Sequence, residues 1–274
     1  MSAVLSGPAA IRVFLAFAGG YFMSYGLRSV NATIAPELVA DFGLSNAQLG
    51  SLSSAYFLSF AAVQIPLGVL LDRFGSRRVD ATLLLVAGVG CLLFAGARSV
   101  EMLWAARALI GIGVSAALMS SLRAFRFWYA AHRQQQLTAW MLLAGSLGAL
   151  ATTVPVQMAL PLIGWRGVFV VSALLLWAAS AAIFLLLPAD EPIPARGDDE
   201  SSWSVYRQVF STPYFWRFGI VSLTVQASFV AFLGLWVGPW LRRVLGMGAD
   251  EAVDVAKIIF QRLREALALA GDLL

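Results

Sequence analysis

Two arginines lie inside apolar stretches of the sequence, where charged side chains are rare and usually functional. Arg28 and Arg107 each fall inside an apolar stretch, about six residues from its end, which corresponds to roughly 9 Å at about 1.5 Å of rise per residue. A cation at such depth in a membrane normally faces a cavity or a partner. Because a guanidinium group holds a carboxylate or phosphate through two parallel hydrogen bonds, the pair favours an anion-binding site. The alternative is that both side chains snorkel to the membrane surface.

Other hydrogen-bonding side chains accompany these arginines. Tyr25 and Asn31 fall at helical spacing around Arg28, and no Asp or Glu lies well inside any of the apolar stretches. Cations without a neutralising acid suit an anionic ligand. The candidate substrate-binding residues are Tyr25, Arg28, Asn31, Tyr56, Gln64, Arg107 and the glutamine that directly follows Val225, Gln226.

Hydrolytic, metal and nucleotide chemistry find no matching residues. The single histidine, His132, stands beside Arg133 with no second histidine or paired carboxylates nearby, and no Gly-x-x-x-x-Gly-Lys pattern occurs. The single cysteine, Cys91, lies in an apolar run and predicts packing. We therefore expect no catalytic residue, no metal, no cofactor and no enzyme activity.

Composition predicts a protein that crosses the membrane several times. Hydrophobic residues make up 60% of the 274 residues and charged residues 12%, whereas a soluble domain has about 25% charged residues. The mean hydropathy is +0.80. The formal charge of +4 is then no sign of nucleic-acid binding, and its meaning lies in how the loops share the arginines.

Apolar runs predict seven spans. They cover roughly 10–34, 47–71, 80–97, 101–123, 136–160, 167–187 and 214–240. The second, fourth and sixth loops hold three arginines each, while the first, third and fifth hold none, one and one. The positive-inside rule therefore predicts a cytoplasmic N-terminus.

Two stretches do not read as spans. A polar linker from 188 to 213 contains a short amphipathic segment, Trp203 to Phe210, that predicts a helix on the membrane surface. The tail, 249–274, carries eight charges between Asp250 and Asp272 and an apolar stripe at helical spacing. It predicts an amphipathic helix that does not span the membrane, either appended to the chain or lying at the interface.

The charged stretch between the second and third spans has a distinctive spacing. It reads Gly-x-x-x-Asp-Arg-x-Gly-x-Arg-Arg and places four charges in seven positions after a run from Leu49 to Leu71 without any. This spacing resembles the cytoplasmic signature of the major facilitator superfamily of transporters. The resemblance implies a gating role for Gly68, Asp72, Arg73, Gly75, Arg77 and Arg78.

Further segments are similar to the same family. Leu103-x-x-x-Arg107-x-x-x-Gly111-x-Gly113 resembles its fourth-helix motif, and Arg28-Ser-Val-Asn31 resembles its organic-anion symporter branch. Members of that branch have an acid directly before the first-helix arginine, where this chain has Leu27, which weighs against proton symport. The fifth-helix antiporter pattern is missing, which weighs against drug efflux. The glycines expected to allow close helix packing are Gly111, Gly113, Gly145 and Gly148.

The expected architecture is all-α. It comprises a six-helix bundle of the major-facilitator type at 1–187, the linker at 188–213, a seventh transmembrane helix at 214–243 and the tail. The resemblance implies transport of a small organic anion by alternating access in the cell (inner) membrane, with protons as a further candidate partner. The partners expected besides the lipid bilayer are a missing C-terminal half or a protein that contacts the 250–272 helix. The rival reading is a truncated or chimeric membrane scaffold that transports nothing; within transporters, it is drug or metabolite efflux.

Overall fold

A computed structural model describes residue 5 and residues 7–188 and 202–231. The chain divides into two compact units, Met1–Ala195 and Arg196–Leu274. The described residues form helices and no strands, and four stretches among them are long and apolar enough to cross a membrane: 7–42, 46–95, 100–128 and 155–186. The predicted all-α membrane fold is confirmed.

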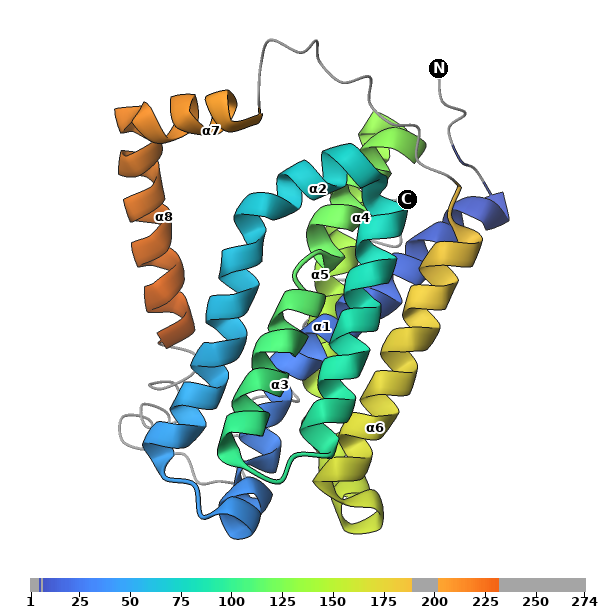
Figure 1. The fold of residues 1–274 in the computed structure, drawn as a ribbon. Coiled ribbons are helices and arrows are strands. Elements are labelled where there is room, and N and C mark those ends of the chain that lie inside the picture. The colour runs from blue at the N-terminus through green and yellow to red at the C-terminus, as the bar shows by residue number, and fades with distance from the viewer. Residues whose placement is uncertain (1–4, 6, 189–201, 232–274) are drawn as a thin grey trace, which may run out of the picture. The chain divides into compact units, whose positions relative to one another are not determined.

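The first unit is a bundle of long helices (Figure 1). In chain order they are α1 (Gly7–Phe42), α2 (Asn46–Ala95), α3 (Val100–Gly113), α4 (Ala117–Trp128), α5 (Gln134–Ala151) and α6 (Val154–Leu186), with a short 3-10 helix, Ala131–Arg133, before α5. The first helix is longer than predicted. It continues through Glu37 and Asp41 to Phe42 and ends at Gly43, whose φ of 65° suits glycine.

Helix α2 is a helical hairpin (Figure 1). Its 50 residues are more than twice the roughly 20 that one crossing needs. Gly75, with a φ of 80°, reverses the chain between the second and third spans. Because an L side chain rarely adopts that φ, the turn depends on glycine. In the same way α6 turns at Gly164, with a φ of 64°. Its residues before the turn form the end of the fifth span, and those after it form the sixth span.

The fourth and fifth spans are interrupted, where the sequence predicted continuous helices over 101–123 and 136–160. The fourth breaks at residues 114–116, between α3 and α4. The fifth breaks at Thr152 and Thr153, just before Pro155, which lacks an N–H and is tolerated in the first turn of a helix. Both breaks leave backbone groups that other side chains must satisfy.

Glycines allow the helices to approach closely. A Cβ atom at Gly113 would collide with the backbone of Ala87, and one at Gly148 with the carbonyl oxygen of Phe22. Such contacts let backbones pack without the hydrophobic driving force that water provides, as membrane helices must. The other two glycines expected to pack, Gly111 and Gly145, have the same tight surroundings against Tyr56 and Tyr21.

The second unit contains α7 (Ser202–Ser211) and α8 (Pro213–Ala231). The first of these covers the segment that predicted a short amphipathic helix, and the second covers the beginning of the predicted seventh span. The rest of that span and the tail at 249–274 lie outside the described residues. The predicted domain boundaries therefore stay predictions.

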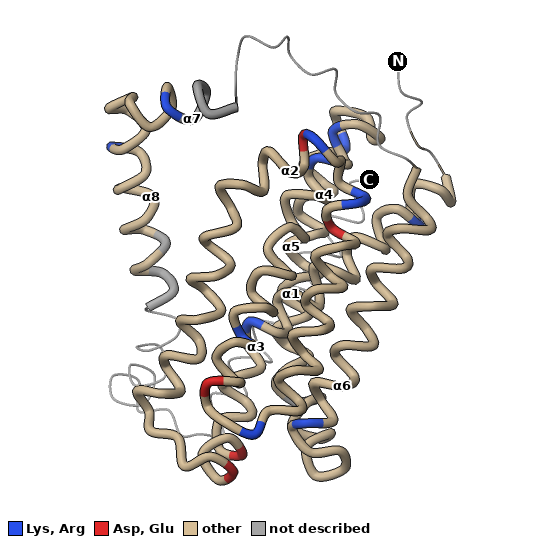
Figure 2. The backbone as a smooth tube through the Cα atoms, in the orientation of Figure 1, with Lys and Arg blue, Asp and Glu red and all other residues tan. Residues whose placement is uncertain are grey.

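Charged residues of the first unit gather towards its two ends, with a small group between them (Figure 2). We call these the Gly75 end, after the turn in α2, and the Asp41 end, after the last turn of α1. The distribution agrees with helices that cross an apolar layer, because a charge within that layer is costly.

Candidate anion-binding site

Arg28 is half-buried on α1 and surrounded by aromatic rings. Its guanidinium carbon lies 4.7 Å from the centre of the Tyr25 ring, 5.3 Å from that of Phe60 and 5.7 Å from that of Phe57. Each ring presents its electron-rich face to the cation, an interaction worth on the order of 1 kcal/mol. The rings thus hold the guanidinium group without neutralising it.

The charge of Arg28 has no acid to balance it in the described part of the chain. Ion pairs there include those of Asp72 with Arg123 and of Asp41 with Arg166, and the Nε of Arg28 is buried without a hydrogen-bond partner. Buried polar groups normally find partners, so an unmet donor on an unpaired cation calls for a ligand. A carboxylate would satisfy both requirements.

Arg107 occupies a different environment from the one expected. Its side chain is only 1% exposed, Nη1 donates to the carbonyl oxygen of Leu27 at 2.9 Å, and Nη2 donates to Oδ1 of Asn31. The guanidinium carbon also lies 4.8 Å from the centre of the Phe94 ring. Arg107 therefore does not face open space. It holds α1 at Leu27, one residue before Arg28, and at Asn31, three residues after it.

Asn31 and Tyr56 extend this network to α2. The amide nitrogen of Asn31 donates to Ser53 Oγ at 3.3 Å, and the Tyr56 hydroxyl donates to the carbonyl oxygen of Ser24 at 3.4 Å. Tyr56 interacts electrostatically with both Arg28 and Arg107. Five of the predicted site residues thus lie together: Tyr25, Arg28, Asn31, Tyr56 and Arg107.

Gln64 lies beside the break in the fourth span. Its Nε2 donates to the carbonyl oxygen of Ser115 at 3.1 Å, and Ser24 Oγ donates to that of Val114 at 3.4 Å. These two side chains satisfy carbonyls that the break leaves without helical partners. The last predicted site residue, Gln226, is on α8 in the second unit, and its side chain is outside what the structure describes.

The predicted gating residues lie at and around the Gly75 turn. Asp72 pairs with Arg123 of α4 at 3.7 Å, and the same arginine reaches Ser76 Oγ at 3.5 Å. Arg77 Nε donates to the carbonyl oxygen of Phe184 on α6 at 2.7 Å. The motif thus ties α2 to α4 and α6. Of the remaining members, Gly68, Arg73 and Arg78 are exposed.

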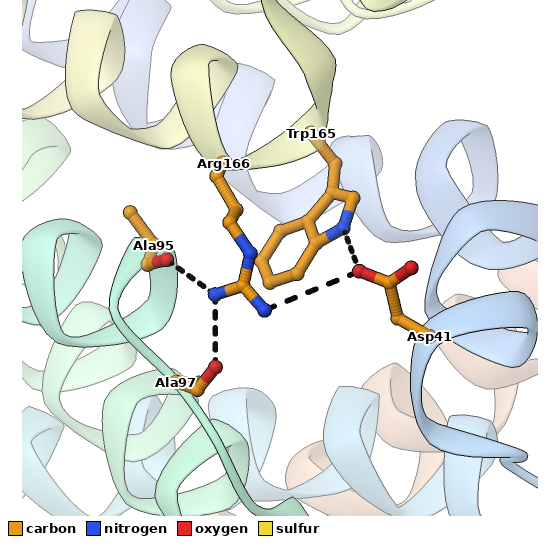
Figure 3. A network of polar contacts seen from close by, with 5 residues as sticks. All are labelled: Asp41, Ala95, Ala97, Trp165 and Arg166. Carbon is orange, nitrogen blue, oxygen red and sulfur yellow. Dashed lines mark hydrogen bonds and ion pairs between the residues drawn. The ribbon is translucent and has the colours of Figure 1, made fainter.

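A second polar network closes the Asp41 end, as Figure 3 shows. Arg166 Nη1 donates to the carbonyl oxygens of Ala95 and Ala97 at 2.7 and 2.8 Å, at the C-terminal end of α2. The Trp165 indole N–H donates to Asp41 at 2.9 Å, and Arg166 lies 4.0 Å from the same carboxylate. Two neighbouring residues of α6 therefore hold the ends of α1 and α2.

Sequence reasoning missed several members of the site. Phe57 and Phe60 follow Tyr56 at the i+1 and i+4 positions, and the i+4 spacing places Tyr56 and Phe60 on one helix face. That aromatic run was a usable signal. Ser53 gave no such signal, because it contributes through a contact with Asn31 across two helices that no local spacing reveals. No group of three or more potential ligands could hold a metal ion among the residues that the structure describes.

Comparison with known proteins gives one family. Residues 17–263 match the family described as the Major Facilitator Superfamily. A probable sulfoacetate transporter, SauU, of Cupriavidus necator is 33% identical over 152 residues, which cover 55% of this chain and 35% of that protein. A gentisate transporter of Corynebacterium glutamicum is 24% identical over 247 residues, covering 87% of this chain and 53% of that protein. The chain thus spans about a third to a half of these relatives.

A solved structure shares the fold. It is a bacterial homologue of the human lysosomal transporter Spinster, inward-facing and unoccupied, with a TM-score of 0.64 and 21% identity. The match covers 90% of this chain and 58% of the other. Because the relatives are named as transporters, the expectation that the chain is not an enzyme is confirmed. The family match also continues past Gly248 into the predicted tail.

Proposed function

The chain belongs to the Major Facilitator Superfamily, and from that premise we propose that it takes part in the transport of a small organic anion by alternating access. The residue that carries the proposal is Arg28. It is the half-buried cation of α1 that no acid of the described residues neutralises and whose Nε has no hydrogen-bond partner. A carboxylate arriving there would exchange water for a charge-assisted pair of hydrogen bonds.

The aromatic rings around Arg28 favour an organic anion over a bare inorganic one. Tyr25, Phe57 and Phe60 offer apolar and π surface directly beside the guanidinium group. A ligand with a carboxylate and a small organic body could contact both at once. Sulfoacetate and gentisate, for which two relatives are named, both have that form.

In this proposal Arg107 positions the site. Its bonds to Leu27 and Asn31 fix the turn of α1 that carries Arg28, so it acts on the ligand through that turn. We also propose that the chain provides one half of the transport unit, because it spans about a third to a half of its relatives and transporters of this kind place substrate between two repeats.

The test is uptake of labelled sulfoacetate and gentisate by cells that express the intact protein, with surface abundance measured in parallel. Arg28→Ala should reduce uptake at least tenfold at equal abundance, because the charge-assisted grip is lost. Arg28→Lys should retain part of it, since an ammonium group keeps the charge but not the two-pronged geometry. The matched control is Arg126→Ala, an exposed arginine of α4.

Normal uptake by Arg28→Ala would mean that the anion binds elsewhere. It would favour the alternative that the Arg28 side chain snorkels to the membrane surface. Absence of uptake for every small organic acid tried, by a well-expressed intact protein, would favour the scaffold interpretation.

A further inference from the structure

An apolar cavity lies between α1, α5 and α6 of the first unit. Its volume is about 210 Å³. It adjoins the break in the fifth span, because Thr152 and Pro155 line it together with Gly26 of α1 and Gly148 of α5. A Cβ atom on Gly26 would lie 3.3 Å from the Gly148 carbonyl oxygen. The two helices therefore meet at these glycines, and the space beside the break stays unfilled.

The cavity is elongated along the helices. On α1 its lining residues fall between Phe22 and Val30, a stretch of about 12 Å at about 1.5 Å of rise per residue. On α6 they recur between Val168 and Leu175 at spacings of three and four residues, which keeps them on one helix face. The cavity is thus a groove that follows the helix axes, the direction in which lipid chains cross half of a bilayer.

The two hydroxyl groups of the lining residues already have hydrogen-bond partners. Thr152 Oγ1 donates to the Ala149 carbonyl oxygen at 2.7 Å, and Ser172 Oγ donates to that of Val168 at 2.8 Å. The Thr152 carbonyl oxygen in turn accepts from Thr33 Oγ1 at 2.6 Å. An apolar cavity of about 150 Å³ is known to stay dry and to take up apolar molecules. A hydrocarbon therefore suits this cavity better than water or an ion.

The cavity opens on the apolar surface of the spans. On its α1 side, Leu27 and Val30 are each 2% exposed. Its other lining residues include Ile163 and Leu175, which are 46% and 50% exposed. Because exposed apolar side chains of membrane-crossing helices face lipid tails of equal polarity, the cavity is continuous with the surface that the bilayer covers.

We propose that this cavity binds one acyl chain of a bilayer phospholipid. A hydrocarbon chain is narrow enough to enter the groove, whereas another helix, about 10–12 Å across with its side chains, is too wide. The chain lies between α1 and α6, beside the break in the fifth span, and completes the packing that the break interrupts.

The site adjoins the turn of α1 that carries Arg28. Leu27 lines the cavity, and its carbonyl oxygen accepts a hydrogen bond from Arg107. A bound chain therefore packs against the turn that Arg107 holds. The inference does not depend on the anion proposal, because neither arginine lines the cavity and the ligand is uncharged hydrocarbon. The two proposals can fail separately.

Photochemical labelling tests the site. The purified chain is placed in vesicles of phosphatidylcholine that carries a diazirine within one acyl chain, and the labelled positions are found by mass spectrometry after illumination. Residues 22–30 of α1 should be labelled, although Leu27 and Val30 are buried. Leu174 of α6, which is exposed and does not line the cavity, reports ordinary contact with lipid.

A variant that fills the cavity should exclude the chain. Ala159→Phe, at a lining residue, should lower the labelling of residues 22–30 several-fold relative to that of Leu174. The matched control is Ala181→Phe, at an exposed alanine of α6 outside the cavity, and it should leave the ratio unchanged. Circular dichroism checks that both variants keep their helices.

Labelling of Leu174 without labelling of residues 22–30 in the unsubstituted chain would overturn the proposal, whether or not the variants fold. An unchanged ratio in folded Ala159→Phe would do the same. Labelling of residues 22–30 that appears only after the chain is diluted to monomers would mean that a second copy covers the cavity, which also overturns the proposal.

Discussion

The two arginines of the site differ in what surrounds them, and this difference separates their roles. Both have ring faces around them and an Nε without a hydrogen-bond partner, but Arg28 is only half-buried, while Arg107 is enclosed and bonded to the backbone of α1. Removing the first takes away a half-buried group whose Nε has no hydrogen-bond partner. Removing the second leaves a buried carbonyl oxygen and an amide without their partner.

We therefore expect substitution of Arg107 to affect mainly the stability of the fold and substitution of Arg28 to affect mainly uptake. Arg107→Gln should lower the free energy of unfolding by about 1–3 kcal/mol, because Leu27 and Asn31 lose a buried donor. Arg28→Ala should lose uptake, while its loss of stability should stay on the order of 1 kcal/mol, because it gives up ring contacts of a half-buried side chain. Thermal unfolding in detergent, measured beside uptake, checks both. Equal loss of stability in the two variants would contradict the assignment of distinct roles.

At this scale the sequence could identify residues but not what they contact. Arg28, Tyr25 and Asn31 share one helix face, so their grouping follows from helical spacing. The enclosure of Arg107 by Phe94 and Phe169 does not, because it depends on how three helices pack. The burial of Asp80 on α2, whose side chain is 0% exposed, was missed for the same reason. It stood at the edge of a predicted span, and only the packing of α4 and α6 shows that it is buried.

The helices of the first unit are held together at the Asp41 end by two residues of α6. Arg166 donates to the carbonyl oxygen of Ala95, the last residue of α2, and to that of Ala97 just beyond it, which is how a basic side chain can complete a helix C-terminus. Trp165 bonds Asp41 in the last turn of α1. Each bond joins elements that lie far apart in the sequence.

Arg166→Gln should accordingly destabilise the chain by about 1–2 kcal/mol, a value reduced from that of a fully buried charged bond because the side chain is partly exposed. The readout is the midpoint of thermal unfolding. Arg98→Gln, at an exposed arginine near the same end, is the matched control and should have little effect. A neutral result for Arg166→Gln would mean that water replaces these bonds at no cost.

Close helix packing gives a second test of the elements. Gly113→Ala should destabilise by about 1–3 kcal/mol, because the added methyl group meets the backbone of Ala87, which cannot move aside cheaply. Gly19→Ala has open space around it and should be neutral or stabilise by up to about 1 kcal/mol. Similar melting temperatures for the two variants would show that α2 and α3 separate more easily than their packing suggests.

Periodicity and hydropathy locate most helices but not their interruptions. The break at 114–116 carries no proline, and it is made tolerable by Ser24 and Gln64 from other helices. No local sequence pattern predicts hydrogen bonds of this kind between distant helices. The break before Pro155 could have been predicted from the proline itself. The hairpin in α2 was foreseen in outline, since a glycine stood among the charges between two apolar runs.

For the molecule as a whole, the distribution of arginines predicts which end faces the cytoplasm. The Gly75 end carries the arginines of the second loop, and the Asp41 end carries Arg98 and Arg166. Single cysteines placed at Arg78 and at Arg98, in a chain with Cys91→Ala, should differ in intact cells. A membrane-impermeant thiol reagent should label position 98 and spare position 78. Labelling of position 78 from outside would reverse the orientation.

The chain reverses at Gly75 within α2 without an intervening loop, and this also affects how α2 enters the membrane. The second and third spans join directly at Gly75, so they form a single hairpin of 50 residues that the insertion machinery must accept in one event. Arg73, Arg77 and Arg78 sit at its tip and resist being drawn through the lipid. Asp72 then has to wait for its partner, because Arg123 follows both spans in the chain and is synthesised after them. Biogenesis of the bundle is therefore ordered: the hairpin is made first, its ion pair with Arg123 of α4 can form only afterwards, and the bond from Arg77 to Phe184 of α6 comes later still.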